Sequence, residues 1–191
     1  MPHEAGASAS FIARLPPLAR DSFESWRQAR RRCAPGQRLP ELGEFAPHGL
    51  PRQVLPWILI HRERADGEFV YGLAGEELVR FFGAYPSGQP ILAYADPAER
   101  AARLAVIRNA VTSGRAVWFT GSLLFEYKDA IPVGRLGLPA LSGPVAARER
   151  VLLLVYFILG PAPKDRSRGA GRSVFDPASV VWCDDGEMPA A

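Results

Sequence analysis

The sequence is poor in the residues that build metal sites and disulfide frameworks. Its 191 residues include only two cysteines and three histidines. Cys33 and Cys183 stand near opposite ends of the chain, with no partner spacing that suggests a zinc site or a disulfide. The histidines, His3, His48 and His61, are too scattered for a metal cluster. We therefore expect a reducing compartment and no metal, haem or flavin cofactor.

Long apolar runs are also missing. The longest, Val151–Leu159, is about half the length of the roughly 20 residues that a membrane-spanning helix needs. The N-terminus lacks a basic segment followed by an apolar stretch, so no signal peptide is predicted. The expected protein is soluble and cytoplasmic, with no membrane partner.

Neither sign of charge is in large excess. The chain has 23 Lys and Arg residues against 20 Asp and Glu residues, a formal net charge of +3. The basic run from Arg27 to Arg32 lacks interleaved aromatic residues and a recognised motif, so a solvated helix face is the favoured interpretation. This balance predicts no nucleic-acid partner.

Motifs of the common enzyme classes are absent from the sequence. It has no Gly-x-Ser-x-Gly elbow, no phosphate-binding loop and no Gly-x-Gly-x-x-Gly after a predicted strand. Asp184 and Asp185 form one carboxylate pair, and Glu126 lies near Asp129, but the first pair belongs to a tail and the second flanks a turn. Solvated charge is the favoured interpretation of both, and we expect a protein without catalytic activity.

Composition divides the chain into four parts. An apolar stripe of Leu18, Phe23 and Trp26 is typical of a helix. The density of Pro and Gly between residues 33 and 56 excludes regular structure of any length and predicts an extended connector. The predicted parts are a disordered N-terminus (1–17), an N-terminal helix with its connector (18–44), one domain (45–160) and a flexible C-terminal tail (161–191).

Hydrophobic periodicity predicts an α+β domain. An Asp-Gly pair between two alternating segments is typical of a β-hairpin. Asp96 as an N-cap, Pro97 at the first position and Gly114 as a stop indicate a helix between them. In chain order, we predict strands at 56–61 and 68–73, a short helix at 76–82, the capped helix, and strands at 116–127, 133–141 and 150–159.

Two groups of polar residues are expected at the surface of this domain. His61 lies where the first predicted strand ends, and an edge or surface role is favoured over a ligand contact or a pH-sensitive one. The apolar face of the capped helix leaves its arginines available to solvent. These arginines are Arg100, Arg103 and Arg108.

A set of short motifs resembles a bacterial subgroup of the PAS domain family, long catalogued as a domain of unknown function. Its members carry a Trp before a basic segment, a Pro-containing connector, a Leu-Pro entering the first strand, an aromatic-Arg-Leu-x-Gly-Thr turn, and a Phe-Gly before a Gly. The matching positions here are Trp26 with Arg30 to Arg32, Pro40, Pro47, Leu55 with Pro56, Tyr71 to Glu76, Phe82 with Gly83, and Gly88. Gly72 and Glu76 stand where the subgroup has its Arg and Thr.

The resemblance covers the chain from about Phe23 to Leu159 and implies a fold and a role. The implied fold is a PAS-like five-stranded antiparallel sheet with helices on one face, here preceded by an N-terminal helix. The implied role is sensory, ligand-binding or protein-interacting, with no catalytic residue to transfer. Two hypotheses follow, a signalling domain that binds a small molecule or a protein partner, and an interaction adaptor whose core is filled and holds no ligand.

Aromatic residues supply the candidate site. Alternate residues of a strand face the covering helices, so these rings fill a plain core in the simpler interpretation and line a cavity in the other. The pocket candidates are Trp57, Phe69, Tyr71, Phe82, Tyr94, Trp118 and Tyr156.

The N-terminal helix is the candidate contact for a partner. A helix of this length is marginal in water, so the apolar side chains of Leu18, Phe23 and Trp26 need a surface to cover. That surface is either the open face of the helix's own sheet or the same helix of a second chain. PAS relatives commonly use such helices in dimer contacts, and the resemblance favours a homodimer or another protein partner.

Overall fold

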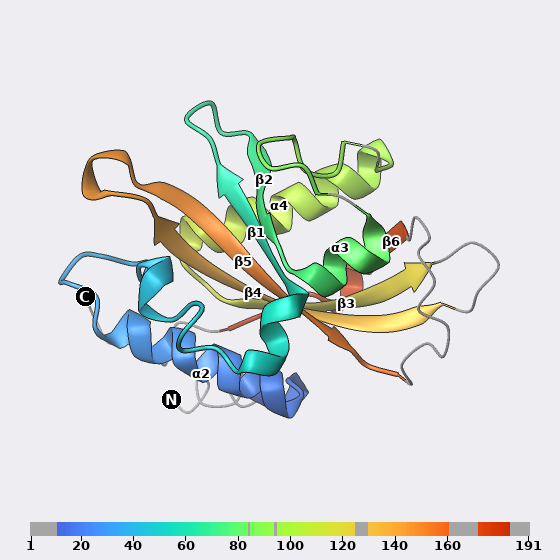
Figure 1. The fold of residues 1–191 in the computed structure, drawn as a ribbon, viewed down its shortest axis with the longest axis horizontal. Helices are drawn as coiled ribbons and strands as arrows, with labels where there is room; N and C mark the ends of the chain where they lie inside the picture. The colour runs from blue at the N-terminus through green and yellow to red at the C-terminus, as the bar shows by residue number, and fades with distance from the viewer. Residues whose placement is uncertain (1–10, 84, 94, 125–129, 161–171, 184–191) are drawn as a thin grey trace, which may run out of the picture.

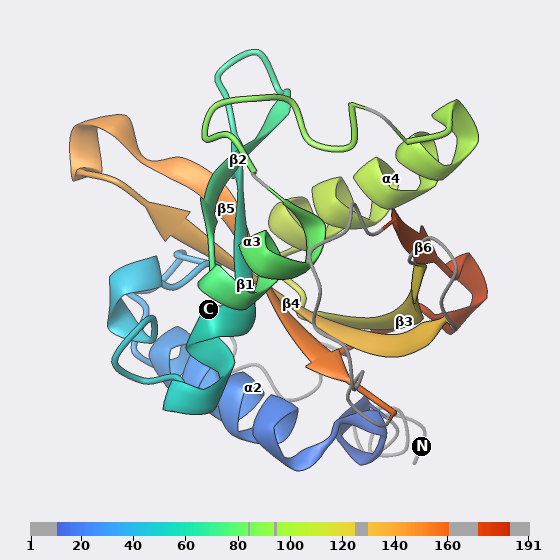
Figure 2. The ribbon, with the colours of Figure 1, turned by 45° about the vertical axis from the view of Figure 1, so that its right-hand side comes forward.

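The computed structural model describes residues 11–83, 85–93, 95–124, 130–160 and 172–183. It is an α+β structure built on one curled antiparallel sheet (Figures 1 and 2). The strands run in the order β2-β1-β5-β4-β3-β6, and β7 also pairs with β3. Their bounds are β1 Ile58–Glu63, β2 Phe69–Ala74, β3 Val117–Leu124, β4 Ile131–Ser142, β5 Glu149–Ile158, β6 Arg172–Phe175 and β7 Val181–Trp182.

The longer α-helices are α2 (Pro17–Arg31), α3 (Glu76–Phe82) and α4 (Pro97–Ser113). Residues 11–14, which were predicted as part of a disordered N-terminus, are also helical. The ends of α4 follow from local chemistry. The Asp96 carboxylate accepts hydrogen bonds from the amides of Ala98 (2.9 Å) and Glu99 (3.3 Å). Gly114 ends the helix at φ 72°, a left-handed conformation that glycine adopts without steric cost. Short 3-10 turns lie at Leu42–Glu44, Arg52–Trp57, Val145–Ala147 and Pro177–Ser179.

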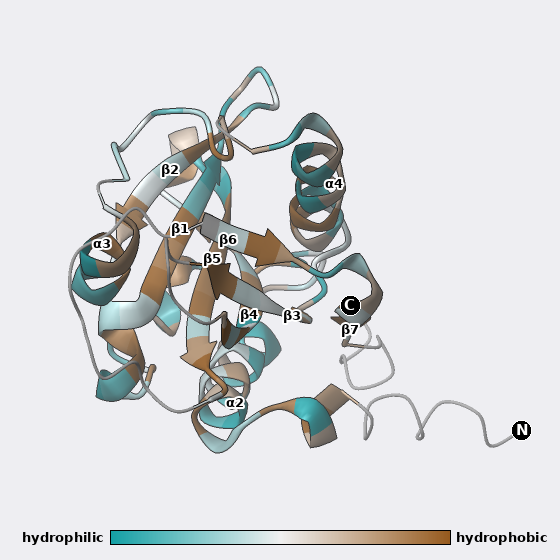
Figure 3. Ribbon diagram, turned by 90° about the vertical axis from the view of Figure 1, so that its right-hand side faces the viewer, coloured by the Kyte–Doolittle hydropathy of each residue, from teal (hydrophilic) through white to brown (hydrophobic). Residues whose placement is uncertain are grey.

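Helices cover both faces of the sheet, with α2 on one side and α3 and α4 on the other (Figure 2). The central strand β5 shows why both faces are apolar. Leu153 and Val155 belong to the core beneath α2, while Leu152 and Leu154 belong to the core beneath α4. A strand buried on both faces reads as a continuous hydrophobic run, which explains the long apolar stretch of the sequence. The hydrophobic colour of the central strands in Figure 3 follows the same pattern.

The sheet differs from the expected five strands with helices on one face. The two additional strands, β6 and β7, come from the region predicted to be a tail. Strand β6 lies so close to β3 that a Cβ on Gly121 would run into the carbonyl oxygen of Val174. Further along the same edge of β3, Ser179 Oγ accepts a hydrogen bond from the Thr120 amide at 2.8 Å. Local patterns in the sequence do not predict these contacts, because the residues that make them are distant from β3 in the sequence.

Several predicted features lie outside the described residues. They are the first part of the N-terminus (1–10), the linker 161–171, and the carboxylates Glu126, Asp129, Asp184 and Asp185. In the part of the chain that is described, no helix combines the length and the apolar character needed to cross a bilayer.

Candidate functional site

A cavity of about 650 Å³ lies on the α4 side of the sheet. Its floor comes from strands β1, β2, β3, β5 and β6, and α4 forms one wall. The segment from Tyr85 to Ala95, of which residues 85–93 and 95 are described, forms the other wall. A volume of this size is within the range of small-molecule sites in proteins, roughly 300–1,000 Å³.

Hydrogen bonds to strand β2 hold this wall in place. The amides of Tyr71 and Gly88 donate to the carbonyl oxygens of Gln89 (2.9 Å) and Tyr71 (2.7 Å), respectively. Leu92 has φ 57°, a left-handed conformation that is unusual for a bulky side chain. Its amide donates to the Tyr71 hydroxyl at 3.3 Å, and the Leu92 side chain lines the cavity. The strained residue is therefore part of the cavity wall.

Aromatic rings make a continuous band along the cavity. Tyr71 meets Tyr85 edge to face at 5.1 Å, Tyr85 meets Phe82 at 6.1 Å, and Phe82 meets Tyr156 at 6.4 Å between ring centroids. Burial raises the pKa of the Tyr71 and Tyr85 hydroxyls above their usual range. Both hydroxyls therefore stay neutral and can donate hydrogen bonds at physiological pH.

His61 also lines the cavity, and its imidazole is neutral there. The residue is 4% exposed, and Nδ1 has no hydrogen-bond partner among the described residues. Burial, with the positive charge of Arg103 adding to it, lowers the pKa of His61 to about 3. The prediction that His61 lies at an edge or on the surface is wrong, because its strand continues to Glu63 and β2 and β5 flank it.

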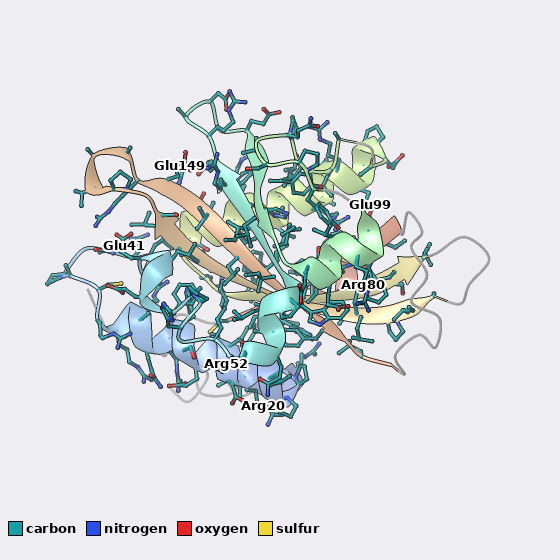
Figure 4. All side chains as sticks on the ribbon, viewed as in Figure 1. Arg20, Glu41, Arg52, Arg80, Glu99 and Glu149 are labelled. Carbon is teal, nitrogen blue, oxygen red and sulfur yellow. The ribbon has the colours of Figure 1, made fainter. Side chains whose placement is uncertain are left out.

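Two arginines meet at the β6 end of the cavity. Arg103 of α4 pairs with Glu99 at 3.3 Å and donates to Ser173 Oγ at 3.3 Å. Arg135 of β4 donates to the same Ser173 oxygen at 2.5 Å. Its guanidinium carbon lies 5.0 Å from the ring centroid of Tyr156, a cation–π distance. Figure 4 shows Glu99 on the α4 side of the sheet, opposite α2 and Arg20.

Strand alternation places Arg135 in this position. Leu136 and Leu138 of β4 face the core beneath α2, so Arg135 faces the side of α4. The residue is 0% exposed, and its Nε and Nη1 have no hydrogen-bond partner among the described residues. Burial lowers the pKa of the guanidinium, although an arginine keeps its charge in proteins.

Sequence reasoning found part of the cavity. Of the predicted pocket residues, Tyr71, Phe82 and Tyr156 line it. Phe69 is buried in the same core without lining the cavity, and Trp57 packs on Phe81 at 5.3 Å.

Two other pocket candidates do not contribute. Trp118 lies on the opposite face of the sheet, where it contacts Phe157 at 5.9 Å, so its assignment to the pocket is wrong. Tyr94 lies outside the described residues.

The polar residues of the site were missed. Arg103 was expected to face solvent, yet its side chain is 11% exposed and lines the cavity. Tyr85 and Ser173 stand in segments predicted as a loop and a tail. The sequence did contain a signal for Arg135, which is a lone arginine between apolar residues of a predicted strand. An arginine in such a position is rarely buried unless other groups compensate its charge.

The structure also places the predicted partner contacts. Phe23 and Trp26 of α2 face the sheet of their own chain and are buried against it. Their rings stack with the centroids 5.8 Å apart. They are therefore not available to a second chain, which corrects the expectation of a dimer contact at these two residues. Leu18 lies on the outer side of the same helix and is 36% exposed.

The aromatic rings of the cavity and the polar groups of His61, Tyr85 and Arg103 can bind and orient a molecule. Within the described residues, no cluster of three His, Cys, Asp or Glu side chains could hold a metal ion. No family model, curated protein or solved structure matches the chain. The function is therefore inferred from the geometry of the cavity.

Proposed function

We propose that the protein is a PAS-type sensory domain that binds a small molecule in the cavity between the sheet and α4, and that it acts without catalysis. The order of its elements supports the proposal. Two strands, two helices and three strands follow one another as in the PAS-like pattern of the sequence. Strands β6 and β7 and helix α2 are additions to that pattern.

The cavity is the observation that carries the proposal. It combines apolar and aromatic walls with a few convergent polar groups, which is the usual composition of a small-molecule site. Buried polar atoms without partners, such as His61 Nδ1, are costly unless something satisfies them. A bound molecule supplies that partner. A filled interaction core, the alternative function, leaves no such space.

One contact offers a route from the cavity to α2. The Arg30 guanidinium of α2 donates a hydrogen bond to the carbonyl oxygen of Gly114, at the end of α4. The same guanidinium lies 5.4 Å from the ring centroid of Trp26. Because α4 forms a wall of the cavity, a molecule that shifts α4 changes this contact. In the proposed mechanism, α2 passes that change to a protein partner.

The direct test is native mass spectrometry of the freshly purified full chain, followed by extraction and identification of any bound molecule. Val106→Phe is the matching variant, because Val106 lines the cavity from α4 and a phenyl ring there reduces its volume. Ala105→Phe is the control, since Ala105 is the exposed neighbour of Val106 on the same helix.

The expected result is a bound species in the wild type and in Ala105→Phe, and its loss from Val106→Phe with folding retained. Small-molecule binding that is equal in all three proteins contradicts the assignment to this cavity. A wild-type protein without any bound species, and without affinity for a small-molecule library in thermal-shift assays, favours the adaptor with a filled core.

A further inference from the structure

We propose that the cavity selects a small organic acid, with its carboxylate at the end formed by Arg103, Ser173 and Tyr156 and its apolar or aromatic body against the remaining walls. This inference rests on the proposed function, because it names the chemical class of the molecule bound in the same cavity. It goes beyond that function because an uncharged ligand fits an apolar cavity equally well.

The charges around the cavity balance in number but not in burial. Four charged side chains line it or lie directly behind its wall, namely Asp96, Glu99, Arg103 and Arg135. Asp96 is exposed and caps α4 with its carboxylate, and Glu99 pairs with Arg103. Among the described residues, no carboxylate pairs with Arg135. One buried positive charge is therefore left without an opposite charge.

Such a charge is expensive to bury. An ion taken out of water loses its hydration, and removal of its partner leaves an uncompensated charge that destabilises the fold. The rings of Tyr156 and Phe119, at 5.0 and 5.7 Å from the Arg135 guanidinium carbon, compensate only in part. An anion bound nearby completes the compensation.

The geometry places that anion at Ser173. Arg103 Nη2 and Arg135 Nη2 both donate to Ser173 Oγ, at 3.3 and 2.5 Å. The two guanidiniums thus approach one point of the cavity wall from α4 and from β4. Arg103 lines the cavity itself, and its planar fork suits a carboxylate. Arg135 acts from behind this wall through its charge and through Ser173.

The other walls suit the body of an acid. Leu59, Ile107 and Leu154 offer apolar contacts, and neutral His61 and Tyr85 offer hydrogen bonds. The single uncompensated positive charge matches one carboxylate. A phosphate ester or a nucleotide carries more negative charge than these residues balance.

The experiment compares acids with their uncharged amides by titration calorimetry on the full chain. The probes are decanoate, 2-naphthoate and indole-3-acetate, each beside its primary amide, which has nearly the same shape. At least one acid is expected to bind about ten-fold or more tightly than its amide, the effect of one hydrogen bond between charged groups. In Arg103→Gln this preference falls several-fold or disappears, because the acid loses more affinity than its amide does.

Arg108→Gln is the matched control. Arg108 is an exposed arginine of the same helix outside the cavity wall, so its substitution changes the net charge equally and leaves the preference intact. Thermal unfolding verifies that both variants fold. Arg103→Lys provides a second comparison, because it keeps the positive charge and lacks the planar guanidinium that can donate two parallel hydrogen bonds. We expect an intermediate preference for acids over amides in this variant.

Two results would overturn the inference in different ways. Amides that bind as tightly as acids, with binding lost in Val106→Phe, leave the small-molecule function standing and refute the selection of acids. If no acid and no amide binds and the purified protein holds no small molecule, the proposed function fails together with the inference.

Discussion

The indole nitrogen of Trp26 donates a hydrogen bond to the carbonyl oxygen of Pro139 at 2.8 Å. This bond joins α2 to the central strand β4. Strand β3 pairs with β4 only between Ile131 and Gly137, so Pro139 lies beyond that ladder. A proline has no amide hydrogen to donate, which suits a position where the neighbouring strand has ended. The helix thus completes the core on one face of its own sheet.

Trp26→Ala is therefore expected to lower the free energy of unfolding by about 3–5 kcal/mol, the usual cost of removing a buried large aromatic side chain. Trp26 is 1% exposed. The mass from sedimentation should not change. Leu18→Ala is the control and should cost far less, because Leu18 is an exposed residue of the same helix. A lower mass with unchanged unfolding would restore the dimer interpretation of this helix.

A fragment spanning residues 45–160 is expected not to melt cooperatively. It lacks Phe23 and Trp26 of the core beneath α2, and it lacks Phe175 of the core beneath α4. Both faces of the sheet would then expose apolar side chains to water, with the loss of the hydrophobic stabilisation that their burial provides. A fragment of residues 11–183 is the comparison and should melt like the full chain. Cooperative melting of the shorter fragment would show that α2 and β6 are dispensable.

Gly134→Ala is expected to destabilise the protein by about 1–3 kcal/mol through overpacking. A Cβ at Gly134 would overlap the indole ring of Trp118, which is buried beneath α2. Gly43→Ala is the control, because no atom lies within 4 Å of its added Cβ. Chemical denaturation measures both. Trp118→Leu should reduce the cost of the Gly134 substitution, since the two residues share one contact. Strictly additive effects would contradict this contact.

The stability of the protein should depend on the protonation of His61 in acid. Its pKa is about 3 in the folded chain, against about 6.5 for an unfolded chain. The unfolded state therefore binds the proton first, and the contribution of His61 is fully present above pH 6.5. It is lost as pH falls toward 3, by up to about 1.4 kcal/mol for each pH unit.

Chemical denaturation between pH 4 and pH 8 measures this dependence. His61→Asn should flatten the slope of the unfolding free energy against pH in that window. The comparison protein is His48→Asn, which carries the same substitution at an exposed histidine of the connector. An equal slope in wild type and His61→Asn would show that the histidine is not buried in its neutral form.

The secondary structure of the domain follows from signals that act over a few residues. The prediction of a helix from Asp96 and Pro97 to Gly114 is confirmed, because an N-cap, a first-turn proline and a left-handed glycine act within one turn. The predicted hairpin is also confirmed, as β1 and β2. Of the strand residues that alternation predicted to point toward a cavity, Tyr71 lines it, Phe69 lies in the same core, and Trp118 lies on the opposite face.

The polar part of the site was not predictable in this way. Arg103 lies beside the apolar stripe of α4, and a local pattern treats such an arginine as solvated. It is largely buried because β6 and the segment after α3 close the space next to it. The aromatic composition suggested a filled core and could not show that several of the rings line a cavity.

The sequence by itself determined the hairpin, the capped helix and the three strands that follow it, since capping, turn chemistry and periodicity are properties of neighbouring residues. Only the tertiary structure decided that α2 covers its own sheet, that β6 pairs with β3, and that Arg103, Arg135 and Ser173 meet at one end of a cavity. At Ser173, for example, Arg135 and Arg103 bind a residue that lies 38 and 70 positions away from them in the sequence. The free energy of these contacts comes from burial and charge shared between distant segments, which no local window of sequence contains.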